Sequence, residues 1–577
     1  MLARLLREYL RPYRGSISIV VVLQLLSTLA TLYLPTLNAQ IIDNGVVKGN
    51  TSYILHDGGL MLAVSFAQIL CAAGAVYFGA RAAMALGRDV RSDLFSRVQE
   101  FSQRELGQFG TPSLITRTTN DVQQVQMLAL MIFTIMVSAP IIAVGSIILA
   151  LNQNVPLSSL FVIIVPLLAI VILFLVSRMR PLFRQMQVRI DRINQVLREQ
   201  ITGVRVIRAF VRDSFESDRF AGANEDLFTV GLGVGRLMAF MFPSVMIIVQ
   251  LASLATIWFG GHLINDGSMQ IGALTAFLSY LVQVLMAVMM ATFLFVMVPR
   301  AEVCAERIEE VLDTASSVVP PKSPISITSV QGRLTMSGVG FGYPGAEQPV
   351  LRNIELVANP GEVTAVIGST GAGKTTLLNL VPRLFDVTAG SVQIDGIDVR
   401  EIDEDLLPDL IGLVPQRPYL FSGTVASNLR YGKPEATDSE LWRVLEIAQA
   451  RSFVEAMADG LEAAITQGGA NLSGGQRQRL AIARAIVHRP RIYLFDDSFS
   501  ALDYATDAAL RAALAEEVLD ATVLIVAQRV STIRQATRIV VLDNGEIVGV
   551  GSHDELMAGN ATYREIVLSQ ITEEEAA

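Results

Sequence analysis

Six long apolar segments in the first 300 residues constrain this chain more than any other feature. They cover residues 15–37, 54–80, 127–151, 156–177, 237–264 and 271–298. A helix needs roughly 20 apolar residues to cross the ~30 Å hydrocarbon core of a bilayer, and each segment is long enough. Buried helices of soluble proteins do not produce six such segments in one half of a chain. The sequence therefore predicts an all-α membrane domain with six transmembrane helices.

The distribution of arginines predicts the orientation of these spans. Six arginines lie in the connection 81–126 and eleven in the connection 178–236, whereas the three other connections together hold only Lys48. Four more arginines precede the first span: Arg4, Arg7, Arg11 and Arg14. Since basic residues accumulate in cytoplasmic loops, the N-terminus and both long connections are expected in the cytoplasm. Leucines and tyrosines share one face of the first 14 residues, which predicts an amphipathic helix on the inner leaflet.

Both long connections are predicted to continue the spans as helices below the membrane. At 1.5 Å per residue, the antiparallel connection 178–236 reaches about 40 Å beyond the bilayer, and the connection 81–126 about 35 Å. Their tips, near Thr111–Asp121 and Phe210–Phe220, are expected to touch whatever lies below the membrane.

The second half of the chain has a different composition. Residues 301–577 hold 22 lysines and arginines against 38 acids, a net charge of −16, whereas residues 1–300 carry +7. A Pro- and Ser-rich linker separates the halves, so the predicted domains are 1–311, the linker 312–328, and 329–577. The overall charge of −9 argues against a nucleic-acid partner. Two cysteines and four histidines argue against a disulfide scaffold, an iron–sulfur protein or a zinc enzyme.

A glycine-rich loop follows a strand-like apolar run at Val363–Ile367. In this context, strand before and helix after, backbone N–H groups of the loop cradle phosphate oxygens at a helix N-terminus. Lys374 supplies a positive charge to the terminal phosphates, and the Thr375 hydroxyl is a candidate ligand of Mg²⁺. The loop residues expected to bind nucleotide are Gly368, Ser369, Thr370, Gly371, Ala372, Gly373, Lys374, Thr375 and Thr376.

Four further motifs follow this loop. They are Gln416 after an apolar stretch, the LSGGQ sequence at Leu472–Gln476, the acid-ended run Ile492–Asp496, and SALD at Ser500–Asp503. In this order and spacing the motifs resemble the ATP-binding cassette (ABC) family, and the six-span first half resembles the membrane domain of ABC exporters. The resemblance covers essentially the whole chain. It implies an α/β ABC nucleotide-binding domain fused to the membrane domain.

The resemblance also implies ATP and Mg²⁺ as ligands of the cassette. It places Tyr343 against the adenine ring, Asp496 and Thr375 at Mg²⁺, and Gln416 near Mg²⁺ and the attacking water. Other residues are implied to close over the ATP of the opposite subunit or to signal between the two sites: Ser473, Gly474, Gly475, Gln476 and Asp503. Because the chain has one membrane domain and one cassette, the family implies a half-transporter that must dimerise.

Two positions depart from the family pattern, and both concern hydrolysis. The family has a glutamate as general base directly after the acid-ended strand and a histidine after the next strand, where this chain has Asp497 and Gln528. Aspartate is one methylene shorter, and a general base must come within about 2.6–3.2 Å of its proton. Glutamine cannot carry a charge toward the transferring phosphoryl group. Losing one such contact typically costs a factor of about 10² or more in rate.

These departures resemble the degenerate-site subunit of heterodimeric bacterial ABC exporters. In such a subunit the chain's own site binds Mg–ATP and hydrolyses it slowly, and the intact LSGGQ sequence completes the competent site of a partner chain. The alternative is an active homodimer that tolerates both substitutions.

The transported molecule is less constrained. The spans contain mild polar groups, Gln24, Gln68, Gln250, Gln283, Tyr280 and His262, and many methionines, Met238, Met241, Met246, Met286, Met289, Met290 and Met297. Methionine suits adaptable apolar sites, so the methionines indicate a cavity for hydrophobic or amphipathic molecules, with ordinary helix packing and lipid contact as the alternative. We expect an ATP-driven exporter of the bacterial plasma membrane. An importer of a lipid or metal chelate with the same fold is a second possibility. An ATP-gated channel is a third, although the spans lack the charged rings of many pores.

Overall fold

The computed structural model describes residues 1–327 and 329–570, and the side chains of all of these except 292–296. It divides into two compact units. The helical unit comprises Met1–Val98 and Pro112–Thr314, and the cassette unit comprises Gln99–Thr111 and the chain from Ala315 onward. Residue 328 of the predicted linker and 571–577 of the predicted cassette lie outside the described residues.

Long helices that could each cross a membrane form the helical unit and confirm the six predicted spans. The first stretch comprises α1 (Leu2–Leu10), η1 (Arg11–Tyr13), α2 (Arg14–Gln40) and η2 (Ile41–Val46), and the second is α3 (Thr51–Glu100). The third comprises α5 (Thr111–Thr116), η3 (Arg117–Asp121), α6 (Val122–Met131), η4 (Ile132–Met136) and α7 (Ser138–Gln153). The last three are α8 (Val155–Thr202), α10 (Asp213–Asn265) and α11 (Ile271–Asp313).

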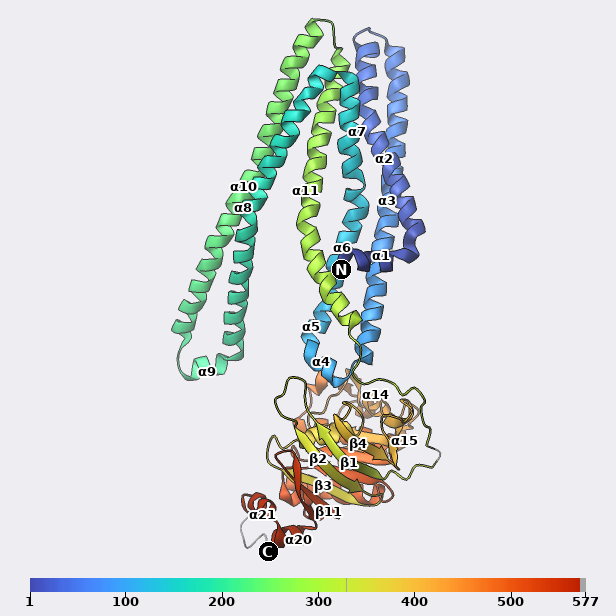
Figure 1. Cartoon of the computed structure of the whole chain (residues 1–577), viewed down its shortest axis with the longest axis vertical. Coiled ribbons are helices and arrows are strands. Elements are labelled where there is room, and N and C mark those ends of the chain that lie inside the picture. The colour runs from blue at the N-terminus through green and yellow to red at the C-terminus, as the bar shows by residue number, and fades with distance from the viewer. Residues whose placement is uncertain (328, 571–577) are drawn as a thin grey trace. The chain divides into compact units, whose positions relative to one another are not determined.

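The helices α8 and α10 form a pair within this unit. They lie along each other and diverge from the other long helices toward the end where α9 (Val204–Ala209) connects them (Figure 1). Ion pairs join them near that end, between Arg189 and Asp226 at 2.7 Å and between Arg219 and Glu199. The connecting turn exposes apolar side chains, because Phe210 is 74% and Val211 80% exposed.

Several of the mild polar groups in the spans join helices to one another. The Tyr280 hydroxyl is buried and lies 2.7 Å from Thr36 Oγ1. Gln68 Nε2 donates to Thr31 Oγ1 at 2.8 Å, and Ser146 Oγ donates to Gln283 Oε1 at 3.2 Å. Gln24 Nε2 donates to the Thr134 carbonyl at 3.3 Å, whereas His262 Nδ1 lies 2.9 Å from the Trp258 carbonyl of its own helix, α10. For these groups, helix packing is the role that the contacts support.

The first long connection reverses direction earlier than the sequence analysis expects. The turn is α4 (Gln103–Phe109), whereas the predicted tip 111–121 already belongs to the returning helix. Ser102 starts α4 with a reciprocal capping box with Glu105, and Gly110 ends it at φ +73°. These two signals fix the turn locally.

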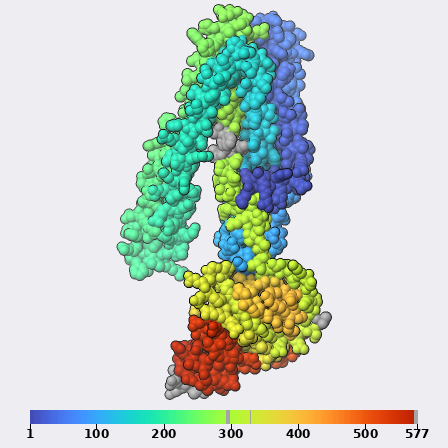
Figure 2. All heavy atoms as spheres, in the orientation of Figure 1, coloured from blue at the N-terminus to red at the C-terminus, as the bar shows by residue number. Residues whose placement is uncertain are grey.

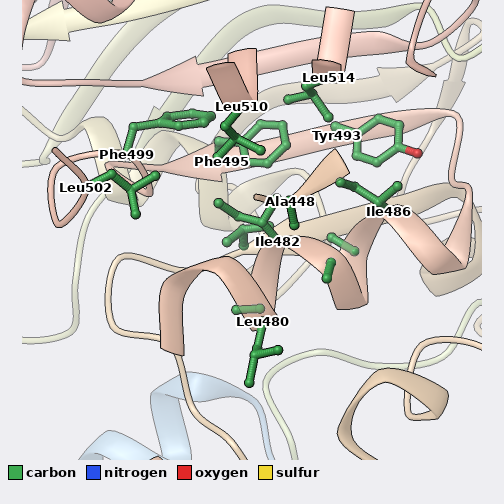
Figure 3. Close-up of a cluster of buried hydrophobic side chains, with 14 of the residues drawn as sticks. Ala448, Leu480, Ile482, Ile486, Tyr493, Phe495, Phe499, Leu502, Leu510 and Leu514 are labelled. Atoms are coloured by element: carbon green, nitrogen blue, oxygen red, sulfur yellow. The ribbon is translucent and has the colours of Figure 1, made fainter. Parts of the chain in front are cut away.

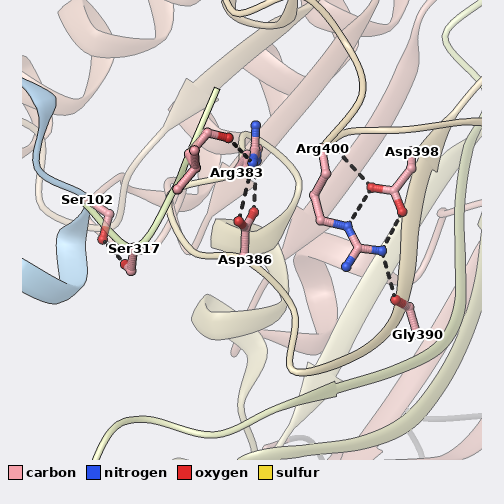
Figure 4. Close-up of polar contacts among 8 residues, drawn as sticks. Ser102, Ser317, Arg383, Asp386, Gly390, Asp398 and Arg400 are labelled. Carbon is pink, nitrogen blue, oxygen red and sulfur yellow. Dashed lines mark hydrogen bonds and ion pairs between the residues drawn. The ribbon is translucent and has the colours of Figure 1, made fainter. Parts of the chain in front are cut away.

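Residues 99–111 pack with the cassette, and the chain after α11 is tied to the same unit. Ser102 Oγ lies 2.9 Å from Ser317 Oγ, and Arg383 Nη2 donates to the Val319 carbonyl at 2.8 Å (Figure 4). Arg383 also pairs with Asp386 at 2.8 Å. The segment 315–319 is therefore held to the cassette by side-chain contacts on both sides.

Two larger sheets build the cassette. A four-stranded antiparallel sheet has the order β2-β1-β4-β5, from β1 (Leu334–Phe341), β2 (Leu351–Ala358), β4 (Ala389–Ile394) and β5 (Ile397–Asp398). A six-stranded sheet has the order β12-β11-β3-β10-β9-β6, from β3 (Val363–Gly368), β6 (Ile411–Val414), β9 (Ile492–Asp496), β10 (Thr522–Val526), β11 (Arg538–Asp543) and β12 (Glu546–Gly551). Only β12 is antiparallel to its neighbour in that sheet. A short ribbon pairs β7 (Gly423–Thr424) with β8 (Ala464–Ile465).

Helices surround the sheets of the cassette. They are α12 (Lys374–Leu380), α13 (Leu406–Leu410), α14 (Val425–Arg430), α15 (Asp438–Ile447), α16 (Arg451–Glu455), α17 (Gly474–His488), α18 (Tyr504–Glu517), α19 (Val530–Ile533), α20 (His553–Gly559) and α21 (Ala561–Leu568), with short 3-10 turns at Gly460–Glu462 and Gln467–Gly469. Ile482 and Ile486 of α17 belong to the same core cluster as Tyr493 and Phe495 of β9, and this cluster includes Phe499 and Leu502 of the following loop (Figure 3). The core thus anchors the loop after β9.

Candidate nucleotide-binding and hydrolysis site

Strand order in the six-stranded sheet brings sequence-distant motifs to one edge. The neighbours β3, β10, β9 and β6 are parallel, so their carboxyl ends meet at the same side, where open α/β sheets bind ligands. Val526 of β10 pairs with Val366 on one side and Asp496 on the other. The phosphate loop, Asp496, Asp497, Gln528 and Gln416 all follow these strands. The edge is therefore the candidate site.

The phosphate loop joins β3 to α12 through glycines in left-handed conformations. Gly371 has φ +88° and Gly373 has φ +99°, which L side chains rarely adopt. Lys374 is only 8% exposed, and its Nζ donates to the carbonyls of Gly368 and Ser369, each at 2.7 Å. Burial lowers the pKa of Lys374, while the nearby charges of Asp497 and Asp496 oppose that shift. The loop thus carries a fixed positive charge beside two carboxylates.

Thr375 and Asp496 provide an oxygen pair suited to Mg²⁺. Thr375 Oγ1 donates to Asp496 Oδ1 at 3.0 Å, and Asp496 is 5% exposed. Burial raises the pKa of Asp496, the Thr375 hydrogen bond lowers it, the Asp497 charge raises it and Lys374 lowers it. A buried carboxylate whose charged form is disfavoured fits a bound cation, and hydroxyl and carboxylate oxygens are the donors that Mg²⁺ prefers.

Asp497 lies next to Gln416 in the structure. Gln416 Nε2 donates to Asp497 Oδ2 at 3.4 Å, a long hydrogen bond, and Asp497 is 8% exposed. The Asp497 backbone is left-handed, with φ +46°, and its N–H donates to the Val526 carbonyl of β10 at 2.8 Å. The structure thus brings Lys374, Thr375, Asp496, Asp497 and Gln416 together.

The loop after β10 positions Gln528, whose side chain is exposed. Two residues that the sequence analysis missed, Gln570 and Arg529, hold this loop. Gln570 Nε2 donates to the Gln528 carbonyl at 2.7 Å, and the Val530 N–H donates to Gln570 Oε1 at 2.9 Å. Arg529 donates to the Ser500 carbonyl at 2.9 Å and to the Leu502 carbonyl at 3.3 Å. The loop of Gln528 is therefore connected to the SALD loop and to Gln570, which follows α21.

Tyr343 combines an exposed ring with fixed neighbours. Its ring is 39% exposed and packs edge-on against Phe341 and Phe385. Its hydroxyl lies 3.1 Å from Thr376 Oγ1, which joins the tyrosine to the first turn of α12. An aromatic ring held beside the phosphate loop can stack on a base. Phe385 and the Thr376 contact were not identifiable from motifs.

The LSGGQ sequence starts α17. Ser473 caps that helix, with Ser473 Oγ accepting from the Gln476 N–H at 3.2 Å and Gln476 Oε1 accepting from the Ser473 N–H at 2.9 Å. A Cβ added to Gly475 would lie 3.2 Å from the Ala501 carbonyl, so this glycine permits close packing against the SALD loop. In the parts of the chain that the structure describes, no hydrogen bond or ion pair joins Ser473–Gln476 to the phosphate loop. Ser473 and Gly474 are exposed, Gly475 and Gln476 are half-buried, and Leu472 is buried.

Asp503 acts as a helix cap. Its Oδ1 accepts from the Thr506 N–H at 2.9 Å and its Oδ2 from Thr506 Oγ1 at 2.8 Å, at the start of α18. These hydrogen bonds, led by that of the Thr506 backbone, lower the pKa of Asp503. The carboxylate thereby fixes the end of the SALD loop.

An apolar six-helix unit and an α/β unit with a phosphate loop define a membrane transporter driven by nucleotide. The chain belongs to the ABC transporter family. Residues 17–288 match the family described as ABC transporter transmembrane region, and residues 351–500 match the family described as ABC transporter. Its fold and relatives identify an exporter-type half-transporter and a multi-pass protein of the bacterial inner membrane.

Three similar proteins support this assignment. The chain is 52% identical to an uncharacterized ABC transporter ATP-binding protein of Mycobacterium tuberculosis, covering 99% of this chain and 98% of that protein. It is 32% identical to a multidrug efflux ATP-binding/permease protein of Mycobacterium bovis, covering 94% of this chain and 45% of that protein. The solved structure of a bacterial Atm1-family ABC exporter with ATP bound has the same fold, with a TM-score of 0.79 at 22% identity over 98% of this chain and 99% of that chain.

Proposed function

We propose that this chain is one half of an exporter that moves hydrophobic or amphipathic molecules across the inner membrane, and that it works with a different partner chain. In this proposal its own nucleotide site binds Mg–ATP and hydrolyses it slowly, while its LSGGQ sequence completes the competent site of the partner. One observation carries the proposal. At the edge of the six-stranded sheet the groups that bind nucleotide are complete, whereas Asp497 and Gln528 replace the groups that hydrolyse it.

Binding is supported by the phosphate loop and its neighbours. Lys374 would hold the terminal phosphates, and the exposed ring of Tyr343 would stack on adenine. Thr375 Oγ1 and Asp496 Oδ1 would hold Mg²⁺, which when bound neutralises charge on the phosphates. None of these groups departs from what nucleotide binding requires.

Slow hydrolysis is supported by the geometry at Asp497. Its backbone is fixed by the hydrogen bond to β10, so the length of the side chain alone sets the reach of its carboxylate. That carboxylate contacts Gln416 Nε2 at 3.4 Å and would accept the proton of an attacking water at one of its oxygens. Gln528 can donate a hydrogen bond and adds no positive charge to the developing phosphoryl transition state.

Exposed apolar side chains of the helical unit support the proposal of a partner chain. The turn that ends the α8–α10 pair exposes Phe210 and Val211, whose burial another protein surface would stabilise. The Mycobacterium bovis relative is about twice as long as the part that this chain covers, which leaves room there for a second half.

The experiment is to measure ATP binding, ATP turnover and particle mass for the purified chain in detergent. We expect saturable Mg–ATP binding with turnover roughly a hundredfold or more below that of a chain with an intact general base. Lys374→Ala is the matched control, because it should abolish binding. Rapid turnover by a homodimer of the wild-type chain would refute the degenerate site.

A further inference from the structure

The bend between α1 and α2 borders an open, positively charged hollow. Its volume is about 600 Å³, and its lining residues are Arg4, Arg7, Glu8, Arg11 and Arg14. The spacing of three and four residues places the first four on one face of α1 and η1. The bend at η1 brings Arg14 of α2 to the same hollow. In Figure 1, α1 lies across α3 and bends into the start of α2, and Figure 2 shows this segment in dark blue on the surface of the helical unit.

The opposite face of α1 and η1 fixes the bend to the protein. Leu2 and Leu5 are buried. The hydroxyl of Tyr9 donates to Asp93 Oδ2 at 2.8 Å, and that of Tyr13 donates to Asp89 Oδ2 at 2.6 Å. In these contacts the carboxylates of Asp89 and Asp93 on α3 accept hydrogen bonds from the tyrosines. The segment that carries the arginines is therefore fixed to α3 through its tyrosines.

The hollow carries an excess of positive charge. Arg7, Arg11 and Arg14 are exposed and form no ion pair within the described residues. Arg4 pairs with Asp313 at 3.5 Å, but both side chains are more than half exposed, so water screens this pair. Glu8 is the only acid that lines the hollow among the described residues. Four guanidinium groups thus surround space that one carboxylate cannot neutralise.

We propose that this hollow binds the phosphate of an anionic phospholipid headgroup in the inner leaflet. Planar guanidinium groups match phosphate oxygens through paired hydrogen bonds, and clustered arginines beside a span attract anionic lipid.

The apolar surface beyond the hollow favours a lipid over a soluble anion. Val21 and Leu25 lie seven and eleven residues after Arg14, on the same face of α2, and are 41% and 39% exposed. A phosphate bound at Arg14 therefore has an apolar helix face next to it, along which acyl chains can lie. A soluble phosphate would gain the guanidinium contacts alone.

The test counts lipids retained by the purified full chain in detergent, using native mass spectrometry. The added lipid is phosphatidylglycerol or phosphatidylcholine, and a third arm adds inorganic phosphate in excess over phosphatidylglycerol. The R7Q/R11Q/R14Q variant removes three charges from the hollow. The matched control, R198Q/R205Q/R208Q, removes three charges from exposed arginines far along the cytoplasmic extension. Binding of Mg–ATP by each variant checks that the chain is folded.

We expect wild type and control to retain phosphatidylglycerol in preference to phosphatidylcholine. The R7Q/R11Q/R14Q variant should lose roughly a hundredfold in phosphatidylglycerol affinity, and inorganic phosphate should not displace the lipid. Equal retention of both lipids by the wild type, or unchanged retention by R7Q/R11Q/R14Q, would overturn the proposal. Displacement by inorganic phosphate would show a soluble-anion site and overturn the lipid assignment.

Discussion

Asp497 is the residue on which the proposed slow hydrolysis depends most. Its left-handed backbone, at φ +46°, costs on the order of 1 kcal/mol in a residue other than glycine. The hydrogen bond from its N–H to the Val526 carbonyl holds it in this conformation. Because β10 fixes the backbone, exchange of the side chain changes the reach of the carboxylate and little else.

Asp496 should carry the Mg²⁺ dependence of nucleotide binding. Asp496→Asn keeps the size of the side chain and removes the charge next to Thr375 Oγ1. We predict that Mg²⁺ increases the ATP affinity of the wild type by about tenfold or more, and that this increase is lost in Asp496→Asn. Titration with a fluorescent ATP analogue, with and without a chelator, measures both affinities. Thr375→Ser keeps the hydroxyl and should behave as the wild type, whereas an unchanged Mg²⁺ effect in Asp496→Asn would exclude Asp496 as a ligand.

At the scale of elements, loops after neighbouring strands are linked by side chains that no motif contains. Arg529 joins the loop after β10 to the SALD loop, and Gln570 holds the same loop from the chain end. The sequence identifies the motifs because each has a fixed local spacing. It does not identify Arg529, Gln570 or Phe385, because their contacts depend on how distant elements pack.

Gln570→Ala should loosen the loop that carries Gln528. The variant loses two hydrogen bonds to the loop backbone, each worth about 0.5–1.5 kcal/mol. We predict that hydrogen exchange at the Val530 amide becomes about tenfold faster while ATP affinity is unchanged. Gln535→Ala, at an exposed glutamine nearby, is the matched control. Equal protection of Val530 in both variants would show that Gln570 does not hold the loop.

The turn at α4 shows a sequence signal that was present and overlooked. Ser102 and Glu105 have the spacing of a capping box, and Gly110 follows as a stop. The length of the connection alone placed the tip near 111–121, after the true turn. A short helix of seven residues is set by its caps rather than by hydrophobic periodicity.

Glu105 should make the stability of α4 depend on pH. Burial alone would raise its pKa, but hydrogen bonds from Ser102 and Ser317 outweigh burial and lower it below 4.5. Because folding lowers this carboxyl pKa, the ionised group stabilises the folded state at pH values above its unfolded pKa. That stabilisation is lost as the pH falls through the pKa of the folded state. We predict that Glu105→Gln weakens amide protection in α4 at pH 7, and that the difference from the wild type disappears in acid. If wild type and Glu105→Gln still differ in amide protection at a pH below the folded pKa of Glu105, the effect comes from packing and not from charge.

At the scale of the whole molecule, the sequence predicts the architecture well because two signals are strong: the long apolar stretches and the order of the cassette motifs. Six apolar stretches are confirmed as long helices, and the phosphate loop, Gln416 and Asp496 lie at the ends of parallel strands of one sheet. The transported molecule is not predictable in the same way. Gln68, Tyr280 and Gln283 form hydrogen bonds between helices. The composition of a span does not distinguish polar residues with this role from polar residues that line a cavity.

The account depends most directly on whether Asp497 and Gln528 limit hydrolysis. The decisive measurement is single-turnover hydrolysis at saturating Mg–ATP by the wild-type chain and by the Asp497→Glu/Gln528→His double variant, each purified alone and matched for ATP binding. We predict that the double variant hydrolyses ATP roughly a hundredfold faster at equal affinity, because it restores the reach of the carboxylate and the charge at position 528. Equal and rapid hydrolysis by both chains would contradict the account and indicate an active homodimer.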